Sequence, residues 1–236
     1  LTVFNGTEPE RFEAEIIGVM RSGIGPGVDM ILARLDHPLL TDISVVAGMS
    51  GSPVFIDDRI IGAVGYGFTF SKKAIAGITP IEKMLDVYEK TDREPPPRDI
   101  ALGPLEDVTP GEPVSLAPKM DLFHREPVRI QSEEFTESMR ALFDNTPDEV
   151  VLEPLTMPLL VSSCSPQTAR AIEEVFKPLG MEPVFAPVGS NAAAMEGNED
   201  VPIQNGTAMG IPYILGDLTM GGIGTVTYLR DEKLVA

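Results

Sequence analysis

The chain has 236 residues, 43% of them hydrophobic, which is enough to bury one large core or two small ones. Its formal net charge of −18 argues against a nucleic-acid partner, because neutralising phosphates requires a basic surface. No apolar run reaches the roughly 18 to 20 residues that a membrane-spanning helix needs, so the sequence predicts no membrane span.

Glycine and proline, at 22 residues each, separate short runs rich in valine and isoleucine, which favours a mainly β protein with many turns. Within residues 1–90 these runs predict strands at 12–20, 30–35, 44–48, 52–57 and 59–67. Residues 22–29 predict a turn, and Asp57-Asp58 predicts a hairpin turn. Residues 79–90 predict a short helix, with Thr79 as N-cap and Pro80 in the first turn.

The middle of the chain has a weaker pattern. Residues 91–99 contain three successive prolines and predict an extended linker. Residues 100–158 carry many prolines and glutamates, and we expect an irregular covering segment there. Within it, residues 135–145 fit a short amphipathic helix.

Residues 159–236 return to a regular pattern. A strand, a helix and a second strand come first, with Ser165 as the helix N-cap. A small polar loop is expected at 190–200, and two β runs joined by a glycine-rich turn occupy 208–236. We therefore expect a strand–helix–strand unit followed by a terminal β segment.

No metal site or cofactor is indicated. The single cysteine, Cys164, excludes an internal disulfide and any metal site built from several cysteines, and we expect it to be structural. Acidic pairs such as Asp57-Asp58 could bind calcium, but solvated turns account for them better.

The stretch that carries chemistry is Gly48-Met49-Ser50-Gly51-Ser52-Pro53, called here the serine turn. It is not the nucleophile elbow of α/β-hydrolases, because Ser52 stands where that elbow has its second glycine. It does meet the Gly-x-Ser-Gly-x-Pro pattern of trypsin-like serine turns. The alternative, a glycine-rich β-turn with a solvent-facing serine, is not decided by these six residues.

Such a turn has a specific chemistry. The N–H groups of Gly48 and Ser50 would converge to hold an oxyanion. We expect Gly48 to need a backbone conformation closed to most side chains, and Gly51 to let a substrate carbonyl approach. Met49 and Pro53 would shape the turn around the serine.

The flanking sequence resembles the SpoIVB peptidase family. The stretch from Gly48 to Val64, the "GITPIEKML" of residues 77–85 and the "GPGVDMILARLDHPLL" of residues 25–40 are similar to motifs of that family. The "GTVTY" of residues 224–228 looks like the strand that leads to the family's Gly-His. This resemblance implies a trypsin-like double β-barrel, here with a strand–helix–strand insertion, and a serine peptidase acting on proteins or peptides.

Carried over by this resemblance, Ser50 is the nucleophile, and Gly48 and Ser50 supply the oxyanion donors. Asp36 is the candidate for the carboxylate that orients the histidine, although its spacing to the serine is one residue shorter than expected. The alternative is that Asp36 caps the turn that follows it.

The base is harder to assign. His37 follows Asp36 directly, so the two side chains of one strand would point to opposite sides. His124 lies in the weakly patterned segment, where a surface role is expected. In the family, the histidine follows the strand that resembles residues 224–228, so the expected base lies beyond Ala236. Either the parent protein continues past Ala236, which we favour, or this branch has lost catalysis.

The sequence thus favours a serine endopeptidase whose isolated 236-residue chain is inactive. The alternative is a non-catalytic peptide-binding or scaffold module on the same fold, with protein partners or self-association. The resemblance also implies an exported or cell-envelope location.

Overall fold

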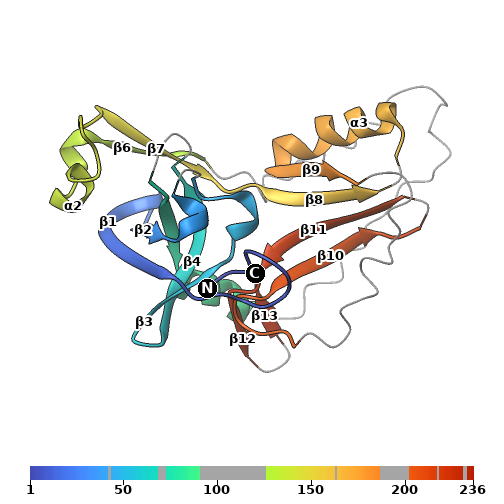
Figure 1. The fold of residues 1–236 in the computed structure, drawn as a ribbon, viewed down its shortest axis with the longest axis horizontal. Helices are drawn as coiled ribbons and strands as arrows, with labels where there is room; N and C mark the ends of the chain where they lie inside the picture. Colours follow the sequence, from blue (N-terminus) through green and yellow to red (C-terminus); the bar gives the residue numbers. More distant parts are fainter. Residues whose placement is uncertain are drawn as a thin grey trace.

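The computed structural model describes residues 1–41, 44–68, 73–90, 126–162, 164–186, 202–216, 218–230 and 233–236. These residues are mainly β and form two sheets and a small hairpin (Figure 1). The linker predicted at 91–99, His124 and the polar loop predicted at 190–200 lie outside the described residues. Within the described part of the chain, no helix is both long and apolar enough to cross a membrane.

The larger sheet has seven strands and is barrel-like and nearly closed. Its strand order is β1-β2-β5-β4-β7-β6, and β3 also pairs with β4. The strands are β1 (Glu13–Gly25), β2 (Val28–Asp36), β3 (Pro53–Ile56), β4 (Arg59–Gly67), β5 (Ile75–Pro80), β6 (Val128–Gln131) and β7 (Glu149–Pro154). Helix α1 (Ile81–Lys90) follows β5 directly. Thr79 and Pro80, predicted as its N-cap and first turn, are instead the last two residues of β5, so the helix begins one residue later than predicted.

The two predicted turns of the first segment are present. β1 and β2 are joined through Pro26 and Gly27, and Gly27 adopts a φ of 72° that suits glycine. β3 and β4 are joined through Asp57 and Asp58, with φ values of 49° and 59°. Two positive φ values in a two-residue loop define the type I′ hairpin turn, whose twist matches that of the paired strands.

The region expected to be irregular contributes two strands to the barrel-like sheet, so that expectation is wrong for residues 126–154. In β6 and β7 the apolar residues Val128, Ile130, Val150 and Leu152 alternate with exposed or half-buried ones and are buried in one core. β7 pairs with β4 and so extends the sheet. The strands are short and set among prolines and glutamates, which obscured their alternation in the sequence.

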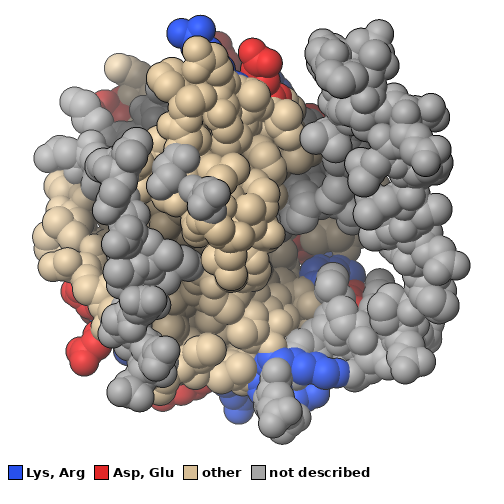
Figure 2. Space-filling view, turned by 90° about the vertical axis from the view of Figure 1, so that its right-hand side faces the viewer, with Lys and Arg blue, Asp and Glu red and all other residues tan. Residues whose placement is uncertain are grey.

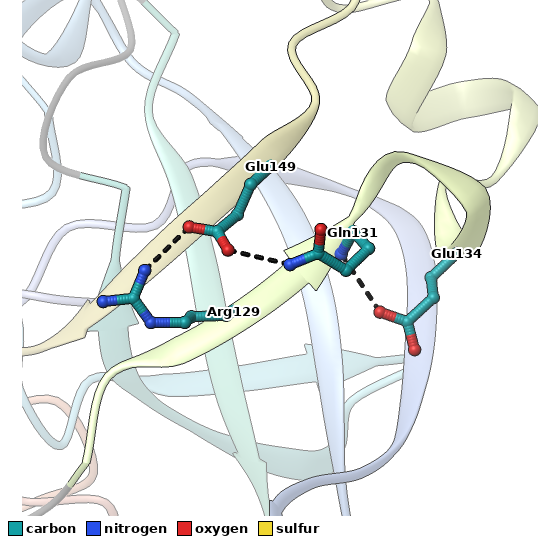
Figure 3. A network of polar contacts seen from close by, with 4 residues as sticks. All are labelled: Arg129, Gln131, Glu134 and Glu149. Carbon is teal, nitrogen blue, oxygen red and sulfur yellow. Dashed lines mark hydrogen bonds and ion pairs between the residues drawn. The ribbon is translucent and has the colours of Figure 1, made fainter.

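A polar network on β6 and β7 lies on the exposed side of this extension (Figure 3). Glu149 accepts hydrogen bonds from Arg129 and from the side chain of Gln131, both at 2.7 Å. The backbone N–H of Gln131 donates to the Glu134 carboxylate at 3.1 Å. The network therefore joins β6 to β7, and it also fixes the first residues of the connection between them. That connection contains the short helix α2 (Glu137–Arg140), where the sequence predicts one.

The smaller sheet has the order β10-β11-β8-β9. Its elements are β8 (Met157–Ser162), α3 (Pro166–Phe176), the 3-10 turn η5 (Lys177–Leu179), β9 (Met181–Phe185), β10 (Ala208–Ile214) and β11 (Thr219–Thr225). β8 and β9 are parallel and α3 connects them, so the chain here runs strand, helix, strand in the order that the sequence predicts. Ser165 caps α3 by accepting from the Thr168 N–H, as predicted.

The smaller sheet is open at both edges in the described residues and does not confirm a second barrel. α3 packs over β8 and β9, where Leu159, Val161 and Ile172 share one core. The side of the molecule at α3 shows uncharged side chains across its middle (Figure 2). A third element, the hairpin of β12 (Tyr228–Arg230) and β13 (Lys233–Val235), ends the described chain.

The positive φ values at the β3–β4 turn generate a stability prediction. Asp58→Gly and Asp58→Ala both remove the exposed ion pair with Arg11, but only glycine is free of side-chain strain at a φ of 59°. We expect the glycine variant to be more stable than the alanine variant by about 1 kcal/mol in urea unfolding. Equal stability of the two variants would mean that the turn is not of this type.

Candidate functional site

The serine turn follows β2 and leads into β3 at the edge of the barrel-like sheet. Residues Ala47–Met49 form a 3-10 turn in which the Met49 N–H donates to the Val46 carbonyl at 2.9 Å. The Met49 side chain is only 2% exposed and packs in the barrel core. The buried Met49 side chain therefore holds the turn against the barrel core.

The left-handed position of the turn is Gly51, not Gly48. Gly51 has a φ of 84°, and a Cβ there would stand 2.3 Å from the Thr225 carbonyl oxygen. Gly48 does not have a positive φ, and a Cβ there would meet no atom within 4 Å. The expected backbone requirement at Gly48 is thus wrong for this conformation. The residue of the turn that has to be glycine is Gly51, because the backbone at Thr225 packs directly against it.

A distant strand segment is hydrogen-bonded to the serine turn at three points. The Thr225 N–H donates to the Ser50 carbonyl at 3.2 Å, and the Thr225 hydroxyl donates to the Gly48 carbonyl at 3.1 Å. The buried Thr227 hydroxyl donates to the Gly51 carbonyl at 2.6 Å. Each of these contacts joins residues more than 170 positions apart, so the turn conformation depends on tertiary structure.

The beginning of the chain supports the turn from another side. The Ser52 hydroxyl donates to the Thr2 hydroxyl at 2.9 Å, and both side chains are buried. The Leu1 nitrogen donates to the Pro53 carbonyl at 3.1 Å. Ser52 is therefore a packing residue of the turn, whereas Ser50 is half-buried and its hydroxyl has no hydrogen-bond partner among the described residues.

Ser50 lines a cleft of about 680 Å³ between the two sheets. The chain that links β7 to β8 forms one wall, and η5 forms another. Residues of β10 and β11 form the floor, on the part of the smaller sheet that α3 leaves open. Ala236 lines the same cleft, and its carbonyl carbon is 3.3 Å from the position a Gly51 Cβ would take.

The two predicted oxyanion donors differ in this conformation. The Ser50 N–H donates to the Ala47 carbonyl at 3.1 Å and is therefore occupied. The Gly48 N–H has no hydrogen-bond partner among the described residues. Because the C=O and N–H of one trans peptide point in opposite directions, the Gly48 N–H points away from the Ser50 N–H that the Ala47 carbonyl faces. The two amides therefore do not converge on an oxyanion position in this conformation.

Asp36 is not brought into the cleft. It is exposed at the end of β2 and lines a separate cavity of about 170 Å³ together with His37. The alternative role expected for Asp36, capping the turn at Pro38–Leu40, belongs to His37, whose Nδ1 accepts the Leu39 N–H at 3.2 Å.

His37 has a structural environment. Its ring is 9% exposed and stacks on Phe4 with 4.0 Å between ring centroids, and Phe12 meets it edge-on. Nε2 lies 3.1 Å from Glu10 Oε1, so Nε2 carries the proton when Nδ1 accepts from Leu39. No histidine of the described chain lines the Ser50 cleft. Among the described residues, no three His, Cys, Asp or Glu side chains lie close enough together to hold a metal ion.

Several site residues were not found from the sequence. The cleft is also lined by Glu153, Leu155, Met157, Lys177, Ile211, Tyr213, Gly222 and Gly224. The closely spaced glycines of β11 were the one available signal, because such glycines in a strand mark a close backbone or ligand approach. Thr225 and Thr227 lie in the "GTVTY" stretch that resembles a family strand, but nothing in that stretch indicated their hydrogen bonds to the serine turn, since their partners are distant in sequence.

Comparison with protein families matches residues 1–85 to the SpoIVB peptidase S55 family. The relationship to the SpoIVB peptidase family that the sequence predicts is therefore confirmed, over the segment that contains β1 to β5 and the serine turn. That family is one of serine peptidases. Comparisons with curated proteins and with solved structures found no significant match.

The two glycines of the serine turn generate a paired prediction. Gly51→Ala forces a Cβ against the Thr225 carbonyl at a positive φ, and we expect it to lower the free energy of unfolding by about 3 kcal/mol. Gly48→Ala enters open space and should change that free energy by less than about 0.5 kcal/mol. Chemical denaturation of both variants checks this, and similar losses at the two positions would contradict the assignment of the strained position.

Proposed function

We propose that the protein acts as a serine endopeptidase with Ser50 as its nucleophile. The observation that carries the proposal is a half-buried serine hydroxyl without a partner among the described residues, at the edge of a 680 Å³ cleft. The turn that presents this hydroxyl lies within the segment matched to a serine peptidase family. A trypsin-like arrangement, in which the second sheet supplies the opposite wall of the cleft, is part of this proposal.

The proposed reaction is acyl transfer to the serine followed by hydrolysis. Ser50 Oγ attacks the carbonyl carbon of the scissile peptide, a base takes the hydroxyl proton, and the carbonyl oxygen becomes an oxyanion. The C–N bond then breaks, and the amine leaves with the proton returned by the base. Water attacks the resulting ester by the same sequence of steps, which releases the acid and restores the serine.

Oxyanion stabilisation requires a local rearrangement. The Ser50 N–H is bonded to the Ala47 carbonyl, and the Gly48 N–H of the same peptide plane points the opposite way. Rotation of the Ala47–Gly48 peptide plane would move that carbonyl away from the Ser50 N–H and turn the Gly48 N–H toward the same point, so that both donors converge. The absence of any atom within 4 Å of a Cβ at Gly48 is consistent with room for this movement. One such donor contributes about 100- to 1000-fold to the rate.

The proposed base is a histidine in the segment that follows Ala236, as the resemblance to the family's terminal Gly-His indicates. The position of Ala236 supports this, because it lines the same cleft as Ser50 and lies against Gly51. The exported or cell-envelope location implied by the resemblance is part of the same proposal.

The alternative is a non-catalytic peptide-binding module on this fold. Two observations favour it: the Ser50 N–H is occupied, and no histidine of the described chain lines the cleft. In this case the cleft would bind a peptide without cleaving it.

A fluorophosphonate probe distinguishes the two functions, because it reacts with an activated serine. We expect the natural full-length protein to be labelled and its Ser50→Ala variant not to be labelled. The matched control is Ser52→Ala, which changes a buried serine of the same turn and should keep the label.

The isolated 236-residue chain should remain unlabelled, because it holds no histidine at the described cleft. A folded full-length protein that shows no Ser50-dependent label would overturn the peptidase proposal.

A further inference from the structure

We propose that the cleft beside Ser50 selects peptides by accepting an uncharged, apolar side chain next to the reacting carbonyl and by rejecting an acidic one. This inference rests on the proposed function, since it concerns which peptide the same site binds. It follows from the lining, the glycines and the charges of the cleft, taken in turn.

The lining of the cleft is mostly apolar. Leu155 and Met157 come from the link between the sheets and the start of β8, and Ile211 and Tyr213 come from β10. A volume of about 680 Å³ lies within the roughly 300 to 1,000 Å³ of typical ligand pockets, so it holds more than one peptide side chain. Moving an apolar side chain from water into such a lining favours binding, because it removes apolar surface from water.

The glycines of β11 give the cleft its shape. At Gly222, a Cβ would stand 2.6 Å from the Tyr213 hydroxyl and 2.7 Å from the Met157 sulfur. The missing side chain therefore lets the Tyr213 hydroxyl contact Met157 Sδ, at 3.6 Å, across the floor.

Gly224 leaves part of the Ser50 cleft open. A Cβ at Gly224 would meet no atom within 4 Å, and its backbone does not have a positive φ. The next residue, Thr225, donates its N–H to the Ser50 carbonyl. The open space beside Gly224 therefore lies one residue from a direct contact with Ser50, and we assign it to the side chain that adjoins the reacting carbonyl.

The charges of the cleft disfavour an acidic side chain. Among the described lining residues only Glu153 and Lys177 are charged. Lys177 Nζ already lies 3.5 Å from Glu182 and 4.0 Å from Glu173, whereas Glu153 has no ion-pair partner in the described part of the chain. The uncompensated charge is therefore negative, and an acidic side chain entering the cleft would lose hydration without gaining a cation.

Tetrapeptide coumarylamides that differ only in their last residue test the proposal on the full-length protein. With Leu, Phe or Glu at that residue, we expect cleavage of the Leu and Phe peptides to exceed cleavage of the Glu peptide by tenfold or more in kcat/KM.

Gly224→Leu should reduce cleavage of the Leu and Phe peptides by tenfold or more while keeping fluorophosphonate labelling. The control Ala208→Leu enlarges an exposed residue of β10 that does not line the cleft, and it should leave cleavage unchanged. Equal cleavage of the Leu and Glu peptides, or full cleavage by Gly224→Leu, would overturn the selectivity proposal.

Binding measurements separate this proposal from the proposed catalysis. Fluorescence anisotropy of the Ser50→Ala protein with tetrapeptide acids ending in Leu or Glu requires no catalysis. We expect at least tenfold tighter binding of the Leu peptide, and loss of that preference in Ser50→Ala/Gly224→Leu. Preferential binding without labelling of the wild-type protein would refute the peptidase and keep the apolar cleft. Ser50-dependent labelling without a preference for the Leu peptide in either assay would refute the apolar selectivity and keep the peptidase proposal.

Discussion

The hydrogen bonds from Thr225 and Thr227 to the serine turn are the constraint on which the rest of the site depends. They join the carbonyls of Gly48, Ser50 and Gly51 to a strand segment more than 170 residues away. Because a buried carbonyl left without a donor costs about 1 to 3 kcal/mol, these contacts select one conformation of a glycine-rich turn that has many available. Gly51 makes the approach of that strand possible, since any side chain would collide with the Thr225 carbonyl.

The same contacts determine where the cleft lies. β11 pairs with β10 and β8 in the smaller sheet, while its last residue is bonded to the serine turn of the larger one. The link between the sheets is held at both ends, because the Leu155 N–H donates to Gly65 and the Met157 N–H donates to Gly180. The cleft is therefore the space between two sheets that are tied together on two sides, and Ser50 opens into it.

The environment of His37 shows why proximity in sequence misleads about catalytic residues. Asp36, His37 and the serine turn lie within 18 positions of one another, yet the two candidate polar residues line a different cavity from Ser50. β2 carries Asp36 to an exposed strand end, and Pro38 turns the chain so that His37 packs between Phe4 and Phe12. Both nitrogens of His37 then have partners within the N-terminal region, which leaves the ring no role at the cleft.

The sequence by itself determined the features that local chemistry controls. Apolar runs marked β1 to β4, paired aspartates marked a hairpin turn, and Ser165 marked the start of α3. The strand predicted at 44–48 is wrong, because Ala47–Met49 forms a 3-10 turn, and β5 was not predicted. The sequence also singled out the serine turn and its family relationship, because those depend on short, contiguous patterns. Tertiary structure alone decided the places of Thr225, Gly224 and β7, since their partners are remote and no local propensity encodes a remote contact. The conformation of the serine turn belongs to the second group: its residues permit several turns, and the strand packed against Gly51 selects one.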